Sequence, residues 1–225
     1  MLRDVDADPA RGRDRSRRAP HNLVLDSRQA FAAAVDPIVV PTPLFEYRNE
    51  GELPAGEPVP QDRMIHPRVE PEIAFVLGSR LEGPGVTATE ALAAVKHVVG
   101  AIEVIDSRFS GYKFTMMDAI ADNNSSGYYV SGPVSVAPEQ LDLSLEAVLL
   151  EVDGEIVDSA TGAAVHGHPA EALAFAANTL GERGLALEPG WVVLTGGMTD
   201  AVPVRPGARL AAHFTSLGSI SLSGG

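Results

Sequence analysis

The sequence predicts an α+β domain with a mixed sheet and a few packed helices. Two strongly apolar, strand-like runs occur at 69–77 and at about 98–106. Further strand-like segments follow one another with no helix between them, including the alternating stretch 143–157. A clear helical pattern begins at His168 and continues to about Glu182. Many strands joined directly, with few helices, favour an α+β domain over a doubly wound sheet.

The first 40 residues differ from the rest of the chain. Arginine and aspartate alternate there to about residue 20, with almost no apolar side chain, which is typical of a poorly ordered tail. We expect a short helix over 28–35 and irregular structure over 36–62, where proline, glycine and charge are frequent. We therefore divide the chain into a divergent N-terminal segment, 1–40, and a main domain, 41–225, which would carry the function.

From His66 onward the pattern is regular. The strand at 69–77 leads to a helix over 88–97, which Thr87 can cap because its hydroxyl can accept a hydrogen bond from the first helical turn. Asp153-Gly154 signals a hairpin turn. The remaining expected elements are a helical or irregular stretch over 116–123, a strand at 127–136, a helix begun by His168-Pro169 and closed by Gly184, and strands at 191–195 and 208–222.

Composition excludes several classes of protein. The formal net charge of -13 argues against nucleic acid as a partner. No apolar stretch reaches the roughly 18 residues that a membrane helix needs. The chain has no cysteine, so disulfides and thiolate chemistry are excluded, and we expect a cytoplasmic protein.

Three glutamates stand inside apolar strand-like runs. Glu70 and Glu72 open the first run and Glu103 interrupts the second. Alternate residues of a strand share a face, so Glu70 and Glu72 are expected to point to one spot. An exposed edge strand is the simpler explanation of one Glu-x-Glu pair. Apolar residues on both faces and the repeated anomaly at Glu103 favour a buried site for Mg²⁺ or Mn²⁺, because hard cations prefer oxygen ligands.

Other polar segments have two interpretations each. Asp106 and Arg108 could pair in a surface turn, or Arg108 or Lys113 could neutralise a substrate carboxylate; spacing alone does not decide. The run 121–127 is typical of a helix end and loop. The glycines of Thr195-Gly196-Gly197-Met198-Thr199 make a plain turn or allow backbone N–H groups to approach an anion.

Five strings in order carry a resemblance to a known family. They are His66-Pro67-Arg68-Val69-Glu70-Pro71-Glu72-Ile73-Ala74-Phe75, Ala101-Ile102-Glu103-Val104-Ile105-Asp106-Ser107-Arg108, Ala121-Asp122-Asn123-Asn124-Ser125-Ser126, Gly167-His168-Pro169 and Leu217-Gly218-Ser219. From about residue 43 onward the chain resembles the hydratase/decarboxylase branch of the fumarylacetoacetate hydrolase superfamily. The branch includes 2-hydroxypenta-2,4-dienoate hydratase and 4-oxalocrotonate decarboxylase.

The resemblance implies a mixed β-sandwich or β-roll in which Glu70, Glu72 and Glu103 hold Mg²⁺ or Mn²⁺. It implies a small 2-oxo acid substrate and metal-dependent decarboxylation of 2-oxohex-3-enedioate in aromatic meta-cleavage catabolism. It also implies a homo-oligomer, or a complex with the partner hydratase or decarboxylase. We assign as catalytic Lys113, Asp122 and Asn123, and as substrate-binding Arg108, Ser125, Gly196, Gly197 and Thr199.

Three alternative activities stay open. The first is the hydratase reaction, which uses the same three glutamates. The second is an inactive, lid-less homologue that serves as a scaffold or binds 2-oxo acids. It is favoured because the family's N-terminal lid carries a lysine for proton handling, whereas no lysine precedes Lys96 in this chain. The third, of lowest weight, is C–C hydrolysis of a different 2-oxo acid.

Overall fold

The computed structural model describes residues 22–24 and 51–225, and it contains two β-sheets and three α-helices within them. The expected helix at 28–35 and the expected tail at 1–20 lie outside the described residues. The strands are β1 Asn22–Val24, β2 Gly51–Glu52, β3 Arg68–Leu77, β4 Val95–Ile105, β5 Ser126–Val136, β6 Ala147–Val152, β7 Glu155–Thr161, β8 Val192–Leu194, β9 Val202–Pro203, β10 Arg209–Phe214 and β11 Ser219–Ser223. The helices are α2 Ala88–Ala93, α3 Met116–Ala121 and α4 Pro169–Gly181.

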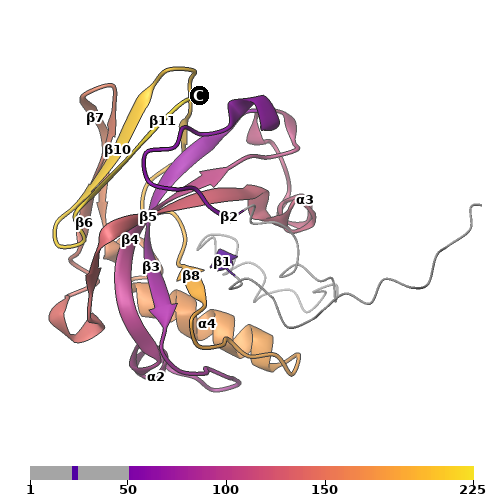
Figure 1. The fold of residues 1–225 in the computed structure, drawn as a ribbon. Coiled ribbons are helices and arrows are strands. Elements are labelled where there is room, and N and C mark those ends of the chain that lie inside the picture. The colour runs from indigo at the N-terminus through magenta and orange to yellow at the C-terminus, as the bar shows by residue number, and fades with distance from the viewer. Residues whose placement is uncertain (1–21, 25–50) are drawn as a thin grey trace, which may run out of the picture.

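The larger sheet has the strand order β1-β8-β3-β4-β5-β2, with β9 also paired to β3, and the smaller sheet has the order β11-β10-β6-β7. Figure 1 shows the smaller sheet beside the long central strands, with α2 and α4 together near the opposite end of those strands. The larger sheet is mixed, since β1 and β2 pair in parallel and β3, β4 and β5 pair antiparallel. The predicted α+β class with a mixed β-sandwich or β-roll is confirmed.

The pairing of β3 with β4 organises the domain. Both strands are rich in β-branched and apolar residues, which favour a sheet that is covered on both sides. Side chains at odd positions of β3, such as Val69, Ile73 and Phe75, enter the main hydrophobic core. Ala74 lies on the opposite face, in a smaller apolar cluster with Val99, Ala101, Tyr129 and Leu194.

The two sheets touch closely at Gly100 of β4. A Cβ atom added at Gly100 would lie 2.8 Å from the ring of Phe214 in β10. Real Cβ atoms do not approach other atoms so closely, so glycine is required for this spacing between the sheets.

The helix caps and the hairpin turn that were expected from short sequence motifs are present in the structure. Thr87 and Glu90 form a capping box at the start of α2, and the His168 ring accepts a hydrogen bond from the Ala170 N–H at the start of α4. Asp153 and Gly154 both have positive φ in the β6–β7 turn, as a two-residue hairpin requires.

Several boundaries differ from the sequence expectation, and two of the differences change an element substantially. The helix expected over 88–97 ends at Ala93, because β4 already begins at Val95, where it pairs with Leu77 of β3. Residues 95–97 therefore pair with β3 as part of a valine-rich strand and do not continue the helix. The segment 208–222 forms two antiparallel strands, β10 and β11, and Gly218 in the turn between them has positive φ. Among the described residues, no helix is both long and apolar enough to cross a membrane.

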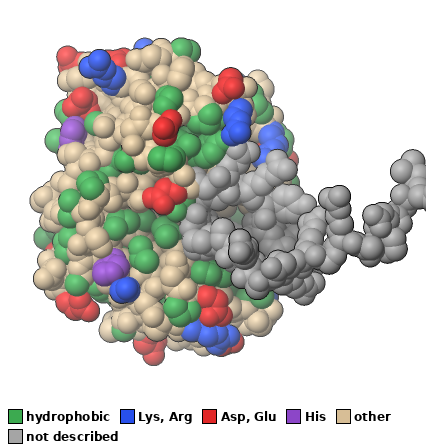
Figure 2. Space-filling model, viewed as in Figure 1, with side chains coloured by type: hydrophobic (Ala, Val, Ile, Leu, Met, Phe, Trp, Pro, Cys, Tyr) green, Lys and Arg blue, Asp and Glu red, His purple; other side chains and the backbone are tan. Residues whose placement is uncertain are grey.

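Charge on the visible face of the molecule is dispersed. Figure 2 shows acidic side chains scattered over this face, with basic ones between them, rather than gathered in one continuous patch. The net negative charge of the chain therefore does not by itself single out a binding surface, and a site has to be identified from buried groups.

Candidate metal centre

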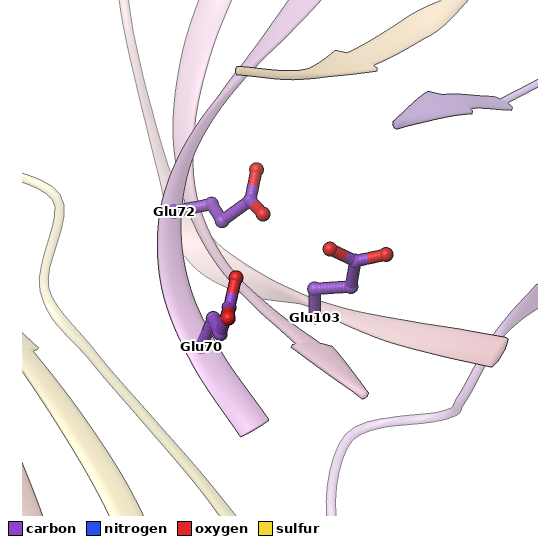
Figure 3. Close-up of side chains that lie close together, drawn as sticks. All are labelled: Glu70, Glu72 and Glu103. Atoms are coloured by element: carbon purple, nitrogen blue, oxygen red, sulfur yellow. The ribbon is translucent and has the colours of Figure 1, made fainter. Parts of the chain in front are cut away.

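Three carboxylates converge on one face of the larger sheet. Glu70 and Glu72 project from β3 and Glu103 from the neighbouring β4, as Figure 3 shows. Glu70 lies directly opposite Glu103 in the antiparallel register. One oxygen from each of the three groups lies within 4.8 Å of the others. The strand alternation and the cross-strand pair therefore bring together the three residues that the sequence predicted.

Burial makes this cluster electrostatically costly without a cation. Glu72 is 0% exposed and Glu103 is 3% exposed. Burial raises the pKa of Glu72 well above its ordinary value, and the charges of Glu103 and Glu70 raise it further. Among the described residues, Glu72 Oε1 has no hydrogen-bond partner. A buried oxygen without a donor, inside an all-carboxylate set, fits a hard divalent cation such as Mg²⁺ or Mn²⁺.

The segment Thr195–Thr199 holds two of the carboxylates in place. The Gly196 N–H donates a hydrogen bond of 2.7 Å to Glu72 Oε2 and acts against the rise in the pKa of Glu72. The carboxylate of Glu70 lies over Gly197, where an added Cβ would collide with Glu70 Oε2. The segment itself is anchored to β3, since the Thr195 hydroxyl donates to the Ile73 carbonyl at 2.8 Å.

These contacts refine what the sequence indicated for the paired glycines. The sequence left open a plain turn or an approach of their backbone N–H groups to an anion, and in the structure the Gly196 N–H contacts the Glu72 carboxylate. Thr199, the last residue of this segment, is buried, and its hydroxyl donates to the Asp200 carbonyl at 3.1 Å. A direct contact of Gly197 or Thr199 with substrate stays a prediction.

Asp122 organises the loop between β4 and β5. Its buried carboxylate accepts hydrogen bonds from the hydroxyls of Ser107 at 2.8 Å and Ser125 at 3.1 Å. The Arg108 guanidinium pairs with the same carboxylate and also donates to the Asp122 carbonyl at 3.0 Å. Burial opposes ionisation, but the hydrogen bonds from Arg108 and Ser107 lower the pKa of Asp122 by more. Three of the predicted site residues, Arg108, Asp122 and Ser125, are thus joined in one hydrogen-bond network.

The backbone beside Asp122 is strained. Asn123, Asn124 and Ser125 all have positive φ, a conformation that costs a non-glycine residue about 1 kcal/mol or more. The Ser125 N–H donates to the Asp122 carbonyl, and its own carbonyl accepts from the Asp106 N–H at 2.6 Å. These bonds hold a turn that the sequence alone presents as a plain polar loop. Asn124 Oδ1 is buried and has no hydrogen-bond partner among the described residues.

The structure leaves Lys113 at the surface. Its side chain is exposed, and its backbone N–H donates to the Ser110 carbonyl.

Arg68 is a charged residue beside the cluster that the sequence analysis did not include. It begins β3 and shares the face of Glu70 and Glu72, since it lies two residues before Glu70. The same strand alternation that pairs the two glutamates could have identified it.

Removing one carboxylate should abolish tight metal binding. We expect Glu72→Ala to lower Mn²⁺ affinity at least about 100-fold, because the ion loses a charged ligand at the most buried position. Calorimetric titration measures this. The metal-free variant should resist urea at least as well as the parent at pH 8, since a costly buried charge is gone. The exposed Glu139→Ala serves as control, and equal Mn²⁺ affinity in Glu72→Ala would contradict the site.

Gly197→Ala tests the placement of Glu70 without removing a carboxylate. The added methyl group must displace the end of the Glu70 side chain, so we expect Mn²⁺ affinity to fall about tenfold or more. The free energy of unfolding of the metal-free protein should fall by no more than about 1 kcal/mol, because the end of the Glu70 side chain can move and the Thr199 carbonyl oxygen, 3.2 Å from the added Cβ, must shift only slightly. An unchanged Mn²⁺ affinity would show that Glu70 is not a ligand.

The raised pKa of Glu72 predicts how stability depends on pH. Below the ordinary glutamate pKa both folded and unfolded Glu72 are protonated. As the pH rises from there towards the raised folded pKa, the unfolded state ionises first and the metal-free fold loses stability. Mn²⁺ needs the ionised carboxylates, so the Tm increase that Mn²⁺ causes should grow from pH 5 to pH 8. Thermal melts with Mn²⁺ or EDTA measure it; a Tm increase independent of pH would contradict the assignment.

Comparison with known proteins places this geometry in context. The family model described as fumarylacetoacetate (FAA) hydrolase C-terminal matches residues 7–222. A 4-oxalocrotonate decarboxylase from Pseudomonas putida is 40% identical over 183 residues, which cover 81% of this chain and 69% of the relative. A 2-hydroxyhexa-2,4-dienoate hydratase from Comamonas testosteroni is 41% identical over 159 residues, which cover 71% of this chain and 60% of the relative.

Solved structures agree with the sequence comparisons. The 4-oxalocrotonate decarboxylase from Pseudomonas putida G7, complexed with magnesium and adipate, superposes with a TM-score of 0.74 at 39% identity. That match covers 77% of this chain and 65% of the solved chain, so the aligned part spans about two thirds of the relatives' length. The family match and the shared fold lead to one conclusion: the chain belongs to the fumarylacetoacetate hydrolase family, among relatives that are decarboxylases and hydratases.

Proposed function

We propose that this protein is a metal-dependent lyase that decarboxylates 2-oxohex-3-enedioate to 2-hydroxypenta-2,4-dienoate. The observation that most supports a metal-dependent lyase is the convergence of Glu70, Glu72 and Glu103 in a buried, all-oxygen cluster. The cluster occurs in a chain that is 40% identical to a 4-oxalocrotonate decarboxylase and superposes on one complexed with magnesium. Glu70, Glu72 and Glu103 would hold Mg²⁺ or Mn²⁺.

The chemistry depends on where negative charge develops. Loss of CO₂ from the far end of the substrate moves an electron pair through the conjugated double bond towards the 2-oxo oxygen. A bound divalent cation supplies the positive charge that stabilises this change. The protein's task is to hold its three carboxylates at fixed positions, which the Gly196 N–H and the close fit of Glu70 over Gly197 accomplish.

The surroundings strengthen these electrostatic effects. Ala74, Ala101, Tyr129 and Leu194 form an apolar layer on the sheet face that carries Glu72 and Glu103. Apolar neighbours exclude water and lower the local dielectric, so each charge acts more strongly than it would in bulk solvent.

The loop between β4 and β5 supplies the remaining proposed groups. Lys113, Asp122 and Asn123 are the proposed catalytic residues, and Arg108 and Ser125 are proposed substrate-binding residues. The hydrogen bonds of Asp122 support a positioning role for its carboxylate, since they hold both Arg108 and Ser125. Gly196, Gly197 and Thr199, next to the glutamates, complete the proposed substrate-binding set.

A second candidate is the hydration of 2-hydroxypenta-2,4-dienoate. Hydratases from Comamonas testosteroni and Paraburkholderia xenovorans are 41% and 38% identical to this chain, close to the value for the decarboxylase. Both reactions use the same carboxylate cluster, so the cluster does not favour either. A homologue that binds 2-oxo acids without turnover is a further alternative.

Product analysis separates these functions. The purified chain with Mg²⁺ should release CO₂ from 2-oxohex-3-enedioate, and both EDTA and Glu72→Ala should abolish the release because each removes the cation. Formation of 4-hydroxy-2-oxopentanoate from 2-hydroxypenta-2,4-dienoate, without CO₂ release from the diacid, would establish the hydratase. Mn²⁺ and oxalate binding with neither reaction would establish the inactive binder and contradict the proposed lyase.

A further inference from the structure

Arg68 is a cation on the same sheet face as the carboxylate cluster. It lies two residues before Glu70 and opposite Ile105 of β4, while Glu70 lies opposite Glu103. Two residues of a strand span about 6.5 Å, so the Arg68 position is one such step from the cluster. The side chain is partly buried rather than fully solvated.

Tyr112 provides a platform for this guanidinium. The Arg68 Cζ atom lies 4.2 Å from the centroid of the Tyr112 ring, a geometry typical of a cation–π contact. The Tyr112 hydroxyl donates hydrogen bonds to the carbonyls of Ile105 at 3.1 Å and His66 at 3.3 Å. The Ile105 carbonyl belongs to the last residue of β4, two residues after Glu103, and the His66 carbonyl lies two residues before the start of β3, so the ring is fixed beside the strands that form the site.

The Arg68 guanidinium forms no ion pair with a residue that the structure describes. Within residues 51–225 its guanidinium makes no ion pair or hydrogen bond, and it stacks on the Tyr112 ring. Arg108, which the sequence analysis assigned to substrate binding, differs because it is paired with the buried Asp122 carboxylate. A stacked, partly desolvated guanidinium presents its remaining N–H donors in a plane that suits a carboxylate.

We propose that Arg68 binds the distal carboxylate of a 2-oxo diacid whose 2-oxo acid end lies at Glu70, Glu72 and Glu103. This assignment rests on the proposed function and adds the residue that selects diacids over monoacids.

Two ligands of equal length test the assignment directly. The Mn²⁺-loaded full chain is titrated in a calorimeter with 2-oxoadipate and with 2-oxohexanoate, which has a methyl group in place of the distal carboxylate. The parent should bind 2-oxoadipate about tenfold or more tightly than 2-oxohexanoate. Arg68→Met should remove this preference by weakening 2-oxoadipate alone, with 2-oxohexanoate and Mn²⁺ affinities within about twofold of the parent.

Variants of Tyr112 and Lys96 distinguish the effect of the Tyr112 ring under Arg68 from the effect of positive charge elsewhere on the protein. Tyr112→Phe keeps the ring face and should keep the preference, whereas Tyr112→Leu should reduce it although Arg68 is present. Lys96→Met removes an exposed positive charge of β4 and should leave the preference intact.

The outcomes separate this inference from the proposed function. Arg68→Met binding 2-oxoadipate as tightly as the parent, or losing both ligands equally, would overturn the role of Arg68 alone. Loss of the preference in Lys113→Ala, together with its retention in Arg68→Met, would also overturn that role. Failure of the Mn²⁺-loaded parent to bind either oxo acid would overturn the proposed function together with the role of Arg68.

Discussion

The antiparallel register that sets Glu70 opposite Glu103 is the constraint on which the rest of the site depends. It forces two carboxylates together across a strand pair, and strand alternation adds Glu72 on the same face. Such a cluster opposes folding unless a cation compensates it, because burial penalises each charge and the charges repel. The domain tolerates this cost because β3 and β4 are long, almost wholly buried and paired along nearly their full length.

The surrounding segments have complementary tasks. The glycine segment after β8 positions the carboxylates from one side, through a backbone N–H on Glu72 and the space that Gly197 leaves for Glu70. The loop between β4 and β5 is held by a second buried carboxylate, Asp122, which is compensated by a guanidinium and two hydroxyls. The charge of the buried Asp122 carboxylate is thus compensated by groups of the protein itself, whereas the three glutamates are arranged to bind a cation from solution.

Much of this arrangement could be predicted from local signals. The anomalous glutamates, the Thr87 cap and the Asp153-Gly154 turn can each be recognised within a few residues. What could not be predicted depends on distant pairing. The early end of α2 follows from the pairing of Val95 with Leu77. The Asp122 network joins residues 15 positions apart, and the polar run that contains it looks like an ordinary loop.

The contact between Gly100 and Phe214 has a mechanical consequence for the whole domain. Gly100 lies three residues before Glu103 on one strand, and Phe214 belongs to the other sheet. Interiors are close-packed, so movement of that aromatic ring is transmitted to the adjoining backbone. The smaller sheet therefore backs the strand that carries the third carboxylate, and sequence changes in that sheet, far from the acidic cluster, can alter the position of Glu103 through this contact.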